Sequence, residues 1–291
     1  MKSKKTISRF AKLLTFVSIA ALLLSLTVCT ASKTGKFRTV DEIKKSGKVV
    51  IGVFSDKAPF GYVDAHGRYK GYDVYFAERI AKDLGVRVEY VSVEPASRVE
   101  FLETGKVDII LANFTVTNAR AEKVDFALPY MKVSLGVVSP DNALITDVDQ
   151  LEGKTLIVAK GTTADSYFTA NHPKVNLLKF DQYTETFNAL IDRRADAFST
   201  DNTEVLAWVL QNPGYTVGIP SLGGLDTIAP AVTKGNTTLL NWINDKIKEL
   251  AGEQFFHKNY DETLAPVYGN AVDPSELVIE GGVVEGTGIG G

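Results

Sequence analysis

The sequence predicts an α/β fold of two lobes, each built on a parallel or mixed sheet, joined by a hinge of two strands. The main observation is a repeated order of elements. Residues 48–113 and residues 153–201 each run strand, polar loop, helix, strand, helix, strand. Two further extended runs, at 131–138 and 227–232, are placed so that the chain crosses to the second lobe and returns. A length of 291 residues suffices for two modest domains.

The first unit has clear local signals for its elements. Residues 48–53 and 107–112 are apolar runs typical of buried strands. In the helix expected at 74–84, apolar side chains recur at helical spacing, with Asp73 as the N-cap and Gly85 just past the end. The expected strands are 48–53, 87–93 and 107–112, and the expected helices are 40–45, 74–84 and 97–104.

The second unit repeats these signals. The sequence of residues 153–158 is similar to that of residues 47–52. Polar residues again follow the last strand, at 199–203. The expected strands are 153–158, 175–180 and 194–201, and the expected helices are 164–170 and 185–193. A further helix is expected at 239–250, after the chain has returned to lobe 1.

The two crossings define the domain organisation. Lobe 1 is expected to be discontinuous, formed by residues 40–135 and 229–275, and lobe 2 to be formed by residues 136–228. Residues 276–291 are rich in glycine after Ile279 and are expected to form a flexible tail.

The composition excludes several classes of function. A formal net charge of −3 offers no basic surface for nucleic acid. The histidines, His66, His172 and His257, are far apart and form no metal-binding motif, so we expect neither a metal nor a cofactor. No GxxxxGK[ST] run is present, so any ATP hydrolysis would belong to a partner protein.

Residues 1–31 have the features of an export signal. Basic residues precede an apolar run, 13–28, that is shorter than the roughly 20 residues of a membrane span. Cys29, the single cysteine, follows directly, in a setting similar to lipoprotein signals, although Val28 stands where a small residue is usual. We favour lipidation of Cys29, while cleavage after Ala31 is the alternative that would remove it. The protein is therefore expected in the periplasm or on the outer face of the cell membrane, touching the membrane only through a lipid anchor.

Four polar loops follow strand carboxyl ends, where open α/β sheets bind ligands. They are residues 55–62 and 113–120 in lobe 1, and 160–163 and 199–203 in lobe 2. Together they should face one cleft, and their charges are of both signs.

The contents of these loops suit a zwitterion. The guanidinium of Arg120 matches a carboxylate, which Thr115 and Thr163 could share at the positive end of a helix starting near residue 164. Asp201 is the natural partner for an ammonium group. Two alternatives stay open: Arg120 pairs with Glu122 or Asp125 on a solvated turn, and Asp201 only caps the helix that follows it.

The same loops supply further candidates. Phe60 and Tyr62 are expected to wall the apolar atoms of a ligand, although Phe60 after Pro59 is also typical of a core aromatic. Thr162 is either a ligand contact or a helix N-cap. We expect no catalytic residue. The full set of expected binding residues is Lys57, Phe60, Tyr62, Arg98, Asn113, Phe114, Thr115, Arg120, Thr162, Thr163 and Asp201.

Several short runs resemble the extracytoplasmic solute-binding proteins of polar amino-acid ABC importers, family 3. These runs are Ala58-Pro59-Phe60, Gly71-Tyr72-Asp73, Gly105-Lys106-Val107-Asp108, residues 117–126 and Pro129-Tyr130. Others are similar to cysteine-binding members: Gly61-Tyr62-Val63-Asp64, residues 98–101, residues 109–115, residues 160–165 and residues 228–232. The resemblance covers nearly all of the chain beyond residue 40. Where the family usually has Pro-Glu before its arginine, this chain has Asn118-Ala119.

The resemblance implies a type II periplasmic-binding-protein-like fold and a monomer that closes on a polar L-amino acid. Its partners would be the permease and ATPase subunits of the transporter. The family pattern puts the α-carboxylate on Arg120, Thr115 and Thr163, and the α-amine on Asp201. L-cysteine is the favoured ligand. The alternative is aspartate or glutamate, whose side-chain carboxylate would meet Lys57 and Arg98.

Two other classes stay open at this point. Enzymes of the cyclohexadienyl or arogenate dehydratase type resemble this fold and would need a general acid, for which Asp73 or Glu94 could serve. A surface adhesin or structural lipoprotein would bind no small ligand. The pairing of Arg120 with Asp201 favours an amino-acid-binding protein over both.

Overall fold

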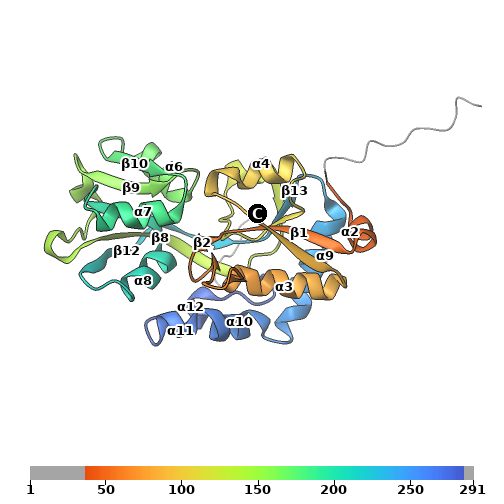
Figure 1. Ribbon diagram of the computed structural model, residues 1–291. Helices are drawn as coiled ribbons and strands as arrows, with labels where there is room; N and C mark the ends of the chain where they lie inside the picture. Colours follow the sequence, from red (N-terminus) through yellow and green to blue (C-terminus); the bar gives the residue numbers. More distant parts are fainter. Residues whose placement is uncertain (1–36, 285–291) are drawn as a thin grey trace, which may run out of the picture. The chain divides into compact units, whose positions relative to one another are not determined.

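The computed structural model of the protein describes residues 37–284 (Figure 1). The expected signal segment, residues 1–31, and the lipidation candidate Cys29 lie outside this range. Two five-stranded sheets organise the described chain, and each contains both parallel and antiparallel pairs. The α/β class with two mixed sheets is therefore confirmed.

The first sheet has the order β5-β1-β6-β13-β7. Strand β1 (Lys48–Val53) lies between β5 (Arg87–Ser92) and β6 (Ile109–Ile110) and runs parallel to both. The late strand β13 (Ala231–Thr233) lies antiparallel between β6 and β7 (Val124–Phe126). This sheet and its helices are called lobe 1 below, and lobe 1 is built from two separate stretches of chain.

The helices of lobe 1 bury their apolar faces against this sheet or one another. Helix α3 (Tyr72–Leu84) contacts β1 and β5, and its apolar residues recur at helical spacing. The other helices are α2 (Val40–Ser46), η1 (Pro95–Ser97), α4 (Arg98–Glu103), α5 (Asn118–Ala121), α9 (Thr237–Ala251), α10 (Phe255–Thr263), α11 (Ala265–Tyr268) and α12 (Pro274–Leu277). A small sheet after β1 holds β2 (Asp56–Lys57), β3 (Gly61–Val63) and β4 (Tyr69–Lys70).

The second sheet has the order β10-β9-β11-β8-β12 and defines lobe 2. Strands β9 (Thr155–Ala159), β10 (Asn176–Phe180) and β11 (Ala197–Asp201) are parallel, whereas β8 (Met131–Pro140) and β12 (Tyr215–Ile228) are antiparallel to their neighbours. The helices are η2 (Asp141–Ala143), η3 (Val148–Leu151), α6 (Thr163–Asn171), α7 (Tyr183–Ile191) and α8 (Asn202–Val209). Both sheets place their last parallel strand just before a polar segment.

Strands β8 and β12 connect the two lobes, and Figure 1 shows them running between the two groups of elements. Met131 pairs with Ile228 at the lobe 1 end of this ladder. There, Ile228 also bridges to Thr115 and Met131 to Val278, both in lobe 1. Only the last residues of β12 were expected from the sequence, because register shifts between Val217 and Asp226 interrupt the alternation that marks a strand.

The expected N-cap role of Asp73 is wrong. Helix α3 begins at Tyr72, and its N-cap is Gly71, whose φ of 115° favours glycine. Asp73 is instead fully buried inside the first turn. Its carboxylate accepts hydrogen bonds from the backbone N–H of Asn113 and the hydroxyl of Tyr130, at 2.7 and 2.5 Å.

The expected flexible tail is wrong for the described part, residues 276–284. Leu277, Val278 and Ile279 are buried, and the N–H of Ile279 donates to the carbonyl of Tyr130 at 3.1 Å. These apolar side chains pack against the core of lobe 1. Their burial holds the segment in place, although the glycines beside them favour a loop. Residues 285–291 lie outside the described range.

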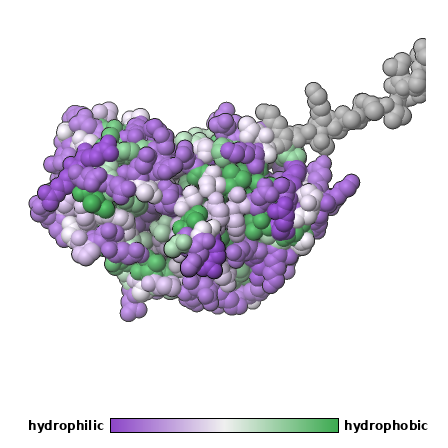
Figure 2. Space-filling view, viewed as in Figure 1, coloured by the Kyte–Doolittle hydropathy of each residue, from purple (hydrophilic) through white to green (hydrophobic). Residues whose placement is uncertain are grey.

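The face of the described chain that Figure 2 shows is mainly hydrophilic. Figure 2 shows apolar residues in separate groups among hydrophilic ones. Within residues 37–284, no helix combines the length and the hydropathy needed to cross a membrane.

Candidate amino-acid-binding site

Lys57 joins the two lobes through buried polar contacts. It lies on β2 in lobe 1, and only 1% of it is exposed. Its Nζ is 2.7 Å from Oδ2 of Asp201 and 3.0 Å from Oε2 of Glu204, both in lobe 2. The same ammonium donates to Oδ1 of Asn113 at 2.6 Å and to the hydroxyl of Tyr183 at 3.3 Å. The structure thus brings the expected residues Lys57, Asn113 and Asp201 together and adds Glu204 and Tyr183.

The charges in this cluster depend on one another. Burial alone would lower the pKa of Lys57, but Asp201 and Glu204 raise it well above its usual value. Burial raises the pKa of Glu204 to about 8, although Lys57 opposes the shift. Oε1 of Glu204 is buried without a hydrogen-bond partner among the described residues. The ammonium is therefore firmly charged, and the pKa of Glu204 lies above that of an ordinary glutamate because of its burial.

Asp201 is held by Lys57 and does not cap α8. It occupies the N-cap position, but its side chain makes no hydrogen bond to the helix backbone. Its Oδ2 accepts from Lys57, and its Oδ1 has no hydrogen-bond partner within residues 37–284. The alternative in which Asp201 only caps the helix is therefore wrong.

Arg120 reaches from lobe 1 to lobe 2. It lies on the short helix α5, and the hydroxyl of Thr117 caps this helix by accepting from the backbone N–H of Arg120. Its Nη1 donates to the carbonyl of Thr115 at 2.7 Å, and its Nη2 donates to the carbonyl of Gly161 in lobe 2 at 3.0 Å. Asp125, its alternative acidic partner, is ion-paired elsewhere, at 2.9 Å from the ammonium of Lys234.

Arg98 lies beside Arg120 and is almost completely buried. Its Nη1 donates to the carbonyl of Ala112 at 2.9 Å, and its Nη2 lies 3.5 Å from the carbonyl of Gly161. Within residues 37–284, neither guanidinium is within salt-bridge distance of a carboxylate. Both lie over the ring of Phe114, at 4.4 Å for Arg98 and 4.8 Å for Arg120. Phe114 therefore supports the two cations from the core of lobe 1.

The two guanidiniums lack a compensating anion. Burial, followed by the charge of Arg120, lowers the pKa of Arg98 to about 9. Burial lowers the pKa of Arg120 to about 10, and Asp201 opposes this shift. Desolvated cations without a carboxylate favour the approach of a negative group. The site can therefore hold a carboxylate next to Arg120.

A cavity of about 360 Å³ opens beside Arg120, between α5, the start of α6 and β12. Thr163, the first residue of α6, lines it with Arg120. Asp201 is not a lining residue, but its strand neighbour Leu135 is. The other lining residues are Thr117, Ala119, Gly161, Ser166, Tyr167, Leu222, Gly223, Gly224 and Asp226. Arg120 thus lines the cavity, and Asp201 lies next to one of its lining residues, across the ladder of β8 and β11.

Thr162 serves as a helix cap. Its hydroxyl donates to the carbonyl of Ala159 at 2.7 Å and accepts from the N–H of Asp165 at 3.2 Å. Both bonds lie within lobe 2, so the hydroxyl is engaged locally. Of the two roles considered for Thr162, ligand contact and helix N-cap, the structure therefore shows the N-cap.

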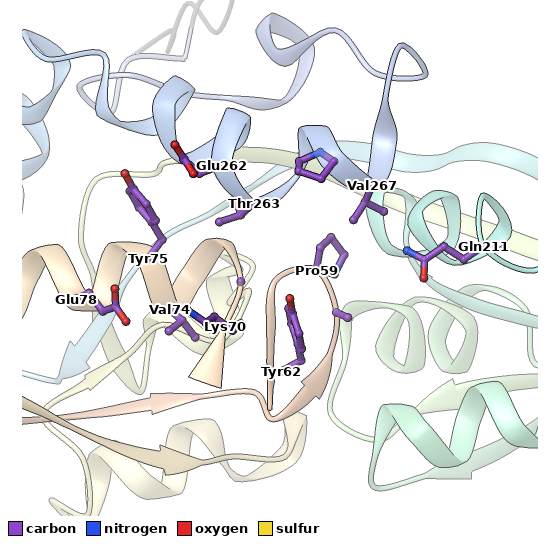
Figure 3. A pocket seen from close by; sticks show the side chains of 13 residues that line it. Pro59, Tyr62, Lys70, Val74, Tyr75, Glu78, Gln211, Glu262, Thr263 and Val267 are labelled. Atoms are coloured by element: carbon purple, nitrogen blue, oxygen red, sulfur yellow. The ribbon is translucent and has the colours of Figure 1, made fainter. Parts of the chain in front are cut away.

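Phe60 and Tyr62 do not line the cavity beside Arg120. Phe60 is fully buried in the core of lobe 1. Tyr62 lines a different cavity, of about 540 Å³. Figure 3 shows Tyr62 and Pro59 on one side of that cavity and Glu262 and Thr263 on the other. The expectation that these aromatics wall a ligand beside Arg120 is therefore wrong for this arrangement.

Sequence reasoning missed Glu204 and Tyr183. Glu204 could have been noticed, because it is a lone acid in the apolar run of residues 203–209 and follows Asp201 by three residues on one helix face. Tyr183 begins α7 with no local signal of its position against Lys57.

Asp73 is unsuited to the role of a general acid. Both its oxygens already accept hydrogen bonds, from Asn113 and Tyr130. Burial raises its pKa to about 6, but its side chain has no exposed surface from which to reach a substrate. Asp73 is therefore not placed to act as the general acid of a dehydratase.

The comparison with known proteins agrees with this geometry. Residues 49–264 match the bacterial extracellular solute-binding proteins, family 3. The chain belongs to this family. A crystal structure of a solute receptor for L-cysteine of Neisseria gonorrhoeae is 55% identical, with a TM-score of 0.82 over 84% of this chain and 100% of that one. The type II fold of this family-3 protein is thereby confirmed.

Two further similar proteins are also amino-acid-binding proteins. The cysteine-binding protein of Campylobacter jejuni is also 55% identical, with a TM-score of 0.82 over 83% of this chain and 98% of that one. The ABC transporter glutamine-binding protein of Bacillus subtilis is 29% identical over 240 residues, 80% of this chain and 87% of that protein. This family-3 protein is the solute-binding component of an amino-acid ABC importer and acts outside the cytoplasm.

Proposed function

We propose that the ligand is L-cysteine, captured between the two lobes and delivered to the permease and ATPase subunits of the importer. The proposal rests on one observation: the positive Arg120 of lobe 1 and the negative Asp201 of lobe 2 both lie where the two lobes meet. Arg120 receives the α-carboxylate together with Thr163, and the free Oδ1 of Asp201 receives the α-ammonium. Because the two charges sit on different lobes, a bound zwitterion favours the closed arrangement.

The state of the two remaining basic residues favours cysteine over aspartate or glutamate. An acidic side chain would need Lys57 or Arg98 as its partner. Lys57 is already paired with Asp201 and Glu204, and Arg98, which is only 2% exposed where Arg120 is half-buried, donates to carbonyls of its own lobe. A short, uncharged side chain leaves these contacts intact, whereas a second carboxylate would have to displace them.

Thermal-shift measurements on the full chain with each of the twenty amino acids and cystine test the proposal. A ligand at 100 times its Kd stabilises the folded state by about 2.7 kcal/mol, which raises the Tm by roughly 5–10 °C for a chain of this size. We expect the largest shift with L-cysteine under reducing conditions. A larger shift with aspartate or glutamate would select the alternative ligand class. No shift with any amino acid would refute the proposal.

We also propose that the mature protein is a monomer anchored through a lipid on Cys29, after removal of the segment before it. The single cysteine at the end of an apolar segment supports this. Cys29→Ala should move the protein from the membrane fraction to the soluble extracytoplasmic fraction. Unchanged membrane retention of the variant would contradict the anchor.

A further inference from the structure

The charges around Lys57 are unequal in number. One ammonium, that of Lys57, faces two carboxyl groups, those of Asp201 and Glu204. All three side chains are buried, so water screens them little. Among the groups in direct contact with Lys57, one cation thus meets two acids, so this contact can accept one more positive charge when both acids are ionised.

Glu204 has an unused oxygen in this cluster. Oε2 contacts Lys57 at 3.0 Å and accepts from the hydroxyl of Thr200 at 3.2 Å, whereas Oε1 is buried and has no hydrogen-bond partner within residues 37–284. Leaving a carboxyl oxygen buried and unbonded is costly. That cost is offset when the carboxylate of Glu204 balances the positive charge of Lys57, which otherwise opposes binding of the ligand.

Without Glu204, Lys57 would compete with the ligand. Lys57 already donates to Oδ2 of Asp201 at 2.7 Å. Its positive charge would therefore repel an α-ammonium arriving at Oδ1 of the same carboxylate. A second acid beside Lys57 removes this repulsion.

We propose that Glu204 is a positioning residue for ligand binding: its carboxylate, formed as the ligand binds, neutralises Lys57, so that the charge of Asp201 is left for the ammonium of the amino acid. This inference rests on the proposed function, in which the ligand is an α-amino acid. When the ammonium binds, Glu204 loses its carboxyl proton to solvent. Two cations, Lys57 and the ligand ammonium, then face two carboxylates, Asp201 and Glu204.

The groups around Glu204 agree with such a proton release. Lys57 on β2 and Asp201 at the end of β11 act on it with opposite signs, and the hydroxyls of Tyr183 on α7 and Tyr268 on α11 lie nearby. Burial raises the pKa of Glu204 to about 8, so it is largely protonated at pH 7. An added positive charge lowers this pKa, so binding releases a proton and affinity rises with pH below about 8.

Calorimetry on the wild-type chain measures the proton directly. Titration with L-cysteine at pH 7, in buffers of different ionisation enthalpy and with a phosphine reductant, gives the number of protons released. The ligand thiol could also contribute, so the test is the difference between the wild type and Glu204→Gln. We expect the wild type to release more protons, approaching one more, and its affinity to rise by up to about tenfold from pH 6 to pH 7, with a flat profile for Glu204→Gln. Equal proton release by both proteins would overturn the inference.

A double-mutant cycle tests the partnership with Lys57. Glu204→Gln should weaken cysteine binding at least tenfold when Lys57 is present, and have little effect in a Lys57→Met background. Glu103→Gln, at an exposed acid on α4, is the matched control and should bind like the wild type. An equal loss in both backgrounds would show that Glu204 acts on the fold and not through Lys57. Absence of binding to the wild type would instead refute the proposed function.

Discussion

Arg98 and Arg120 point their guanidinium groups at one carbonyl oxygen, that of Gly161 in the opposite lobe, at 3.5 and 3.0 Å. Both also lie over the ring of Phe114. Two like charges in one place repel each other unless an anion joins them. The pair therefore both ties the lobes together and prepares the site for a carboxylate.

Arg120→Ala should weaken binding of every α-amino acid that binds the wild type. The α-carboxylate is common to all of them, and a charge-assisted bidentate bond is worth about 1.5–3 kcal/mol, or roughly 10- to 150-fold in Kd. Calorimetric titration with several amino acids measures this, with Arg87→Ala at an exposed strand residue as the control. A loss confined to one ligand would contradict the role given to Arg120.

Gly161→Ala should weaken ligand binding by keeping the lobes apart. A Cβ at Gly161 would lie 2.7 Å from the Cα of Ala96 in lobe 1. Gly153→Ala is a matched control, because both glycines have φ of +74° but Gly153 has no atom within 4 Å of an added Cβ. Each variant should lose about 1–2 kcal/mol of stability from backbone strain, and only Gly161→Ala should lose affinity as well. Similar affinities of the two variants would exclude this close contact from the binding-competent form.

Arg98→Met should destabilise the fold itself. The guanidinium is 2% exposed and satisfies the carbonyls of Pro95, Ala112 and Asn113. Removing it leaves buried acceptors unpaired, at a cost of about 2–4 kcal/mol. Urea unfolding measures the change, which should exceed that of Arg87→Met. A variant as stable as the wild type would mean that the carbonyls find other donors.

Asp73→Asn should change how stability depends on pH. Burial raises the pKa of Asp73 from near 4 to about 6. The folded chain therefore holds this proton more tightly than the unfolded chain, and the contribution is lost as pH rises from about 4 to about 6. Two pH units correspond to about 3 kcal/mol in the free energy of unfolding.

Urea unfolding at several pH values detects this contribution as a difference between proteins. The fall in stability between pH 4 and pH 6.5 should be smaller for Asp73→Asn than for the wild type. Asp192→Asn, at an exposed position after α7, should follow the wild type. Parallel curves for all three proteins would show that Asp73 does not carry the shift.

Most of the fold could be read from the sequence because its strands and helices carry local signals. The apolar run of residues 48–53 coincides with β1, and Gly47 ends α2 in the left-handed conformation expected of a C-cap. Strand β12 was largely missed, since its glycines and register shifts depend on pairing with β8. Local patterns reveal elements that are stable by themselves and hide those shaped by a distant partner.

The site was predictable at the level of residue types and less so in its contacts. Arg120 and Asp201 stood out because charged residues follow buried strands. The engagement of Lys57 with Asp201 was not foreseen, because it joins positions 144 residues apart across the two lobes. Long-range pairing of this kind depends on how closely the lobes approach, which no local sequence pattern encodes.

The discontinuity of lobe 1 has a mechanical consequence. Residues 37 and 284, the limits of the described chain, both belong to lobe 1, while lobe 2 is inserted through β8 and β12. A pulling force applied at these two points in an optical trap would load lobe 1 first and leave lobe 2 unstretched. The rupture of lobe 1 should therefore precede that of lobe 2 in every trace, whatever their relative thermal stabilities.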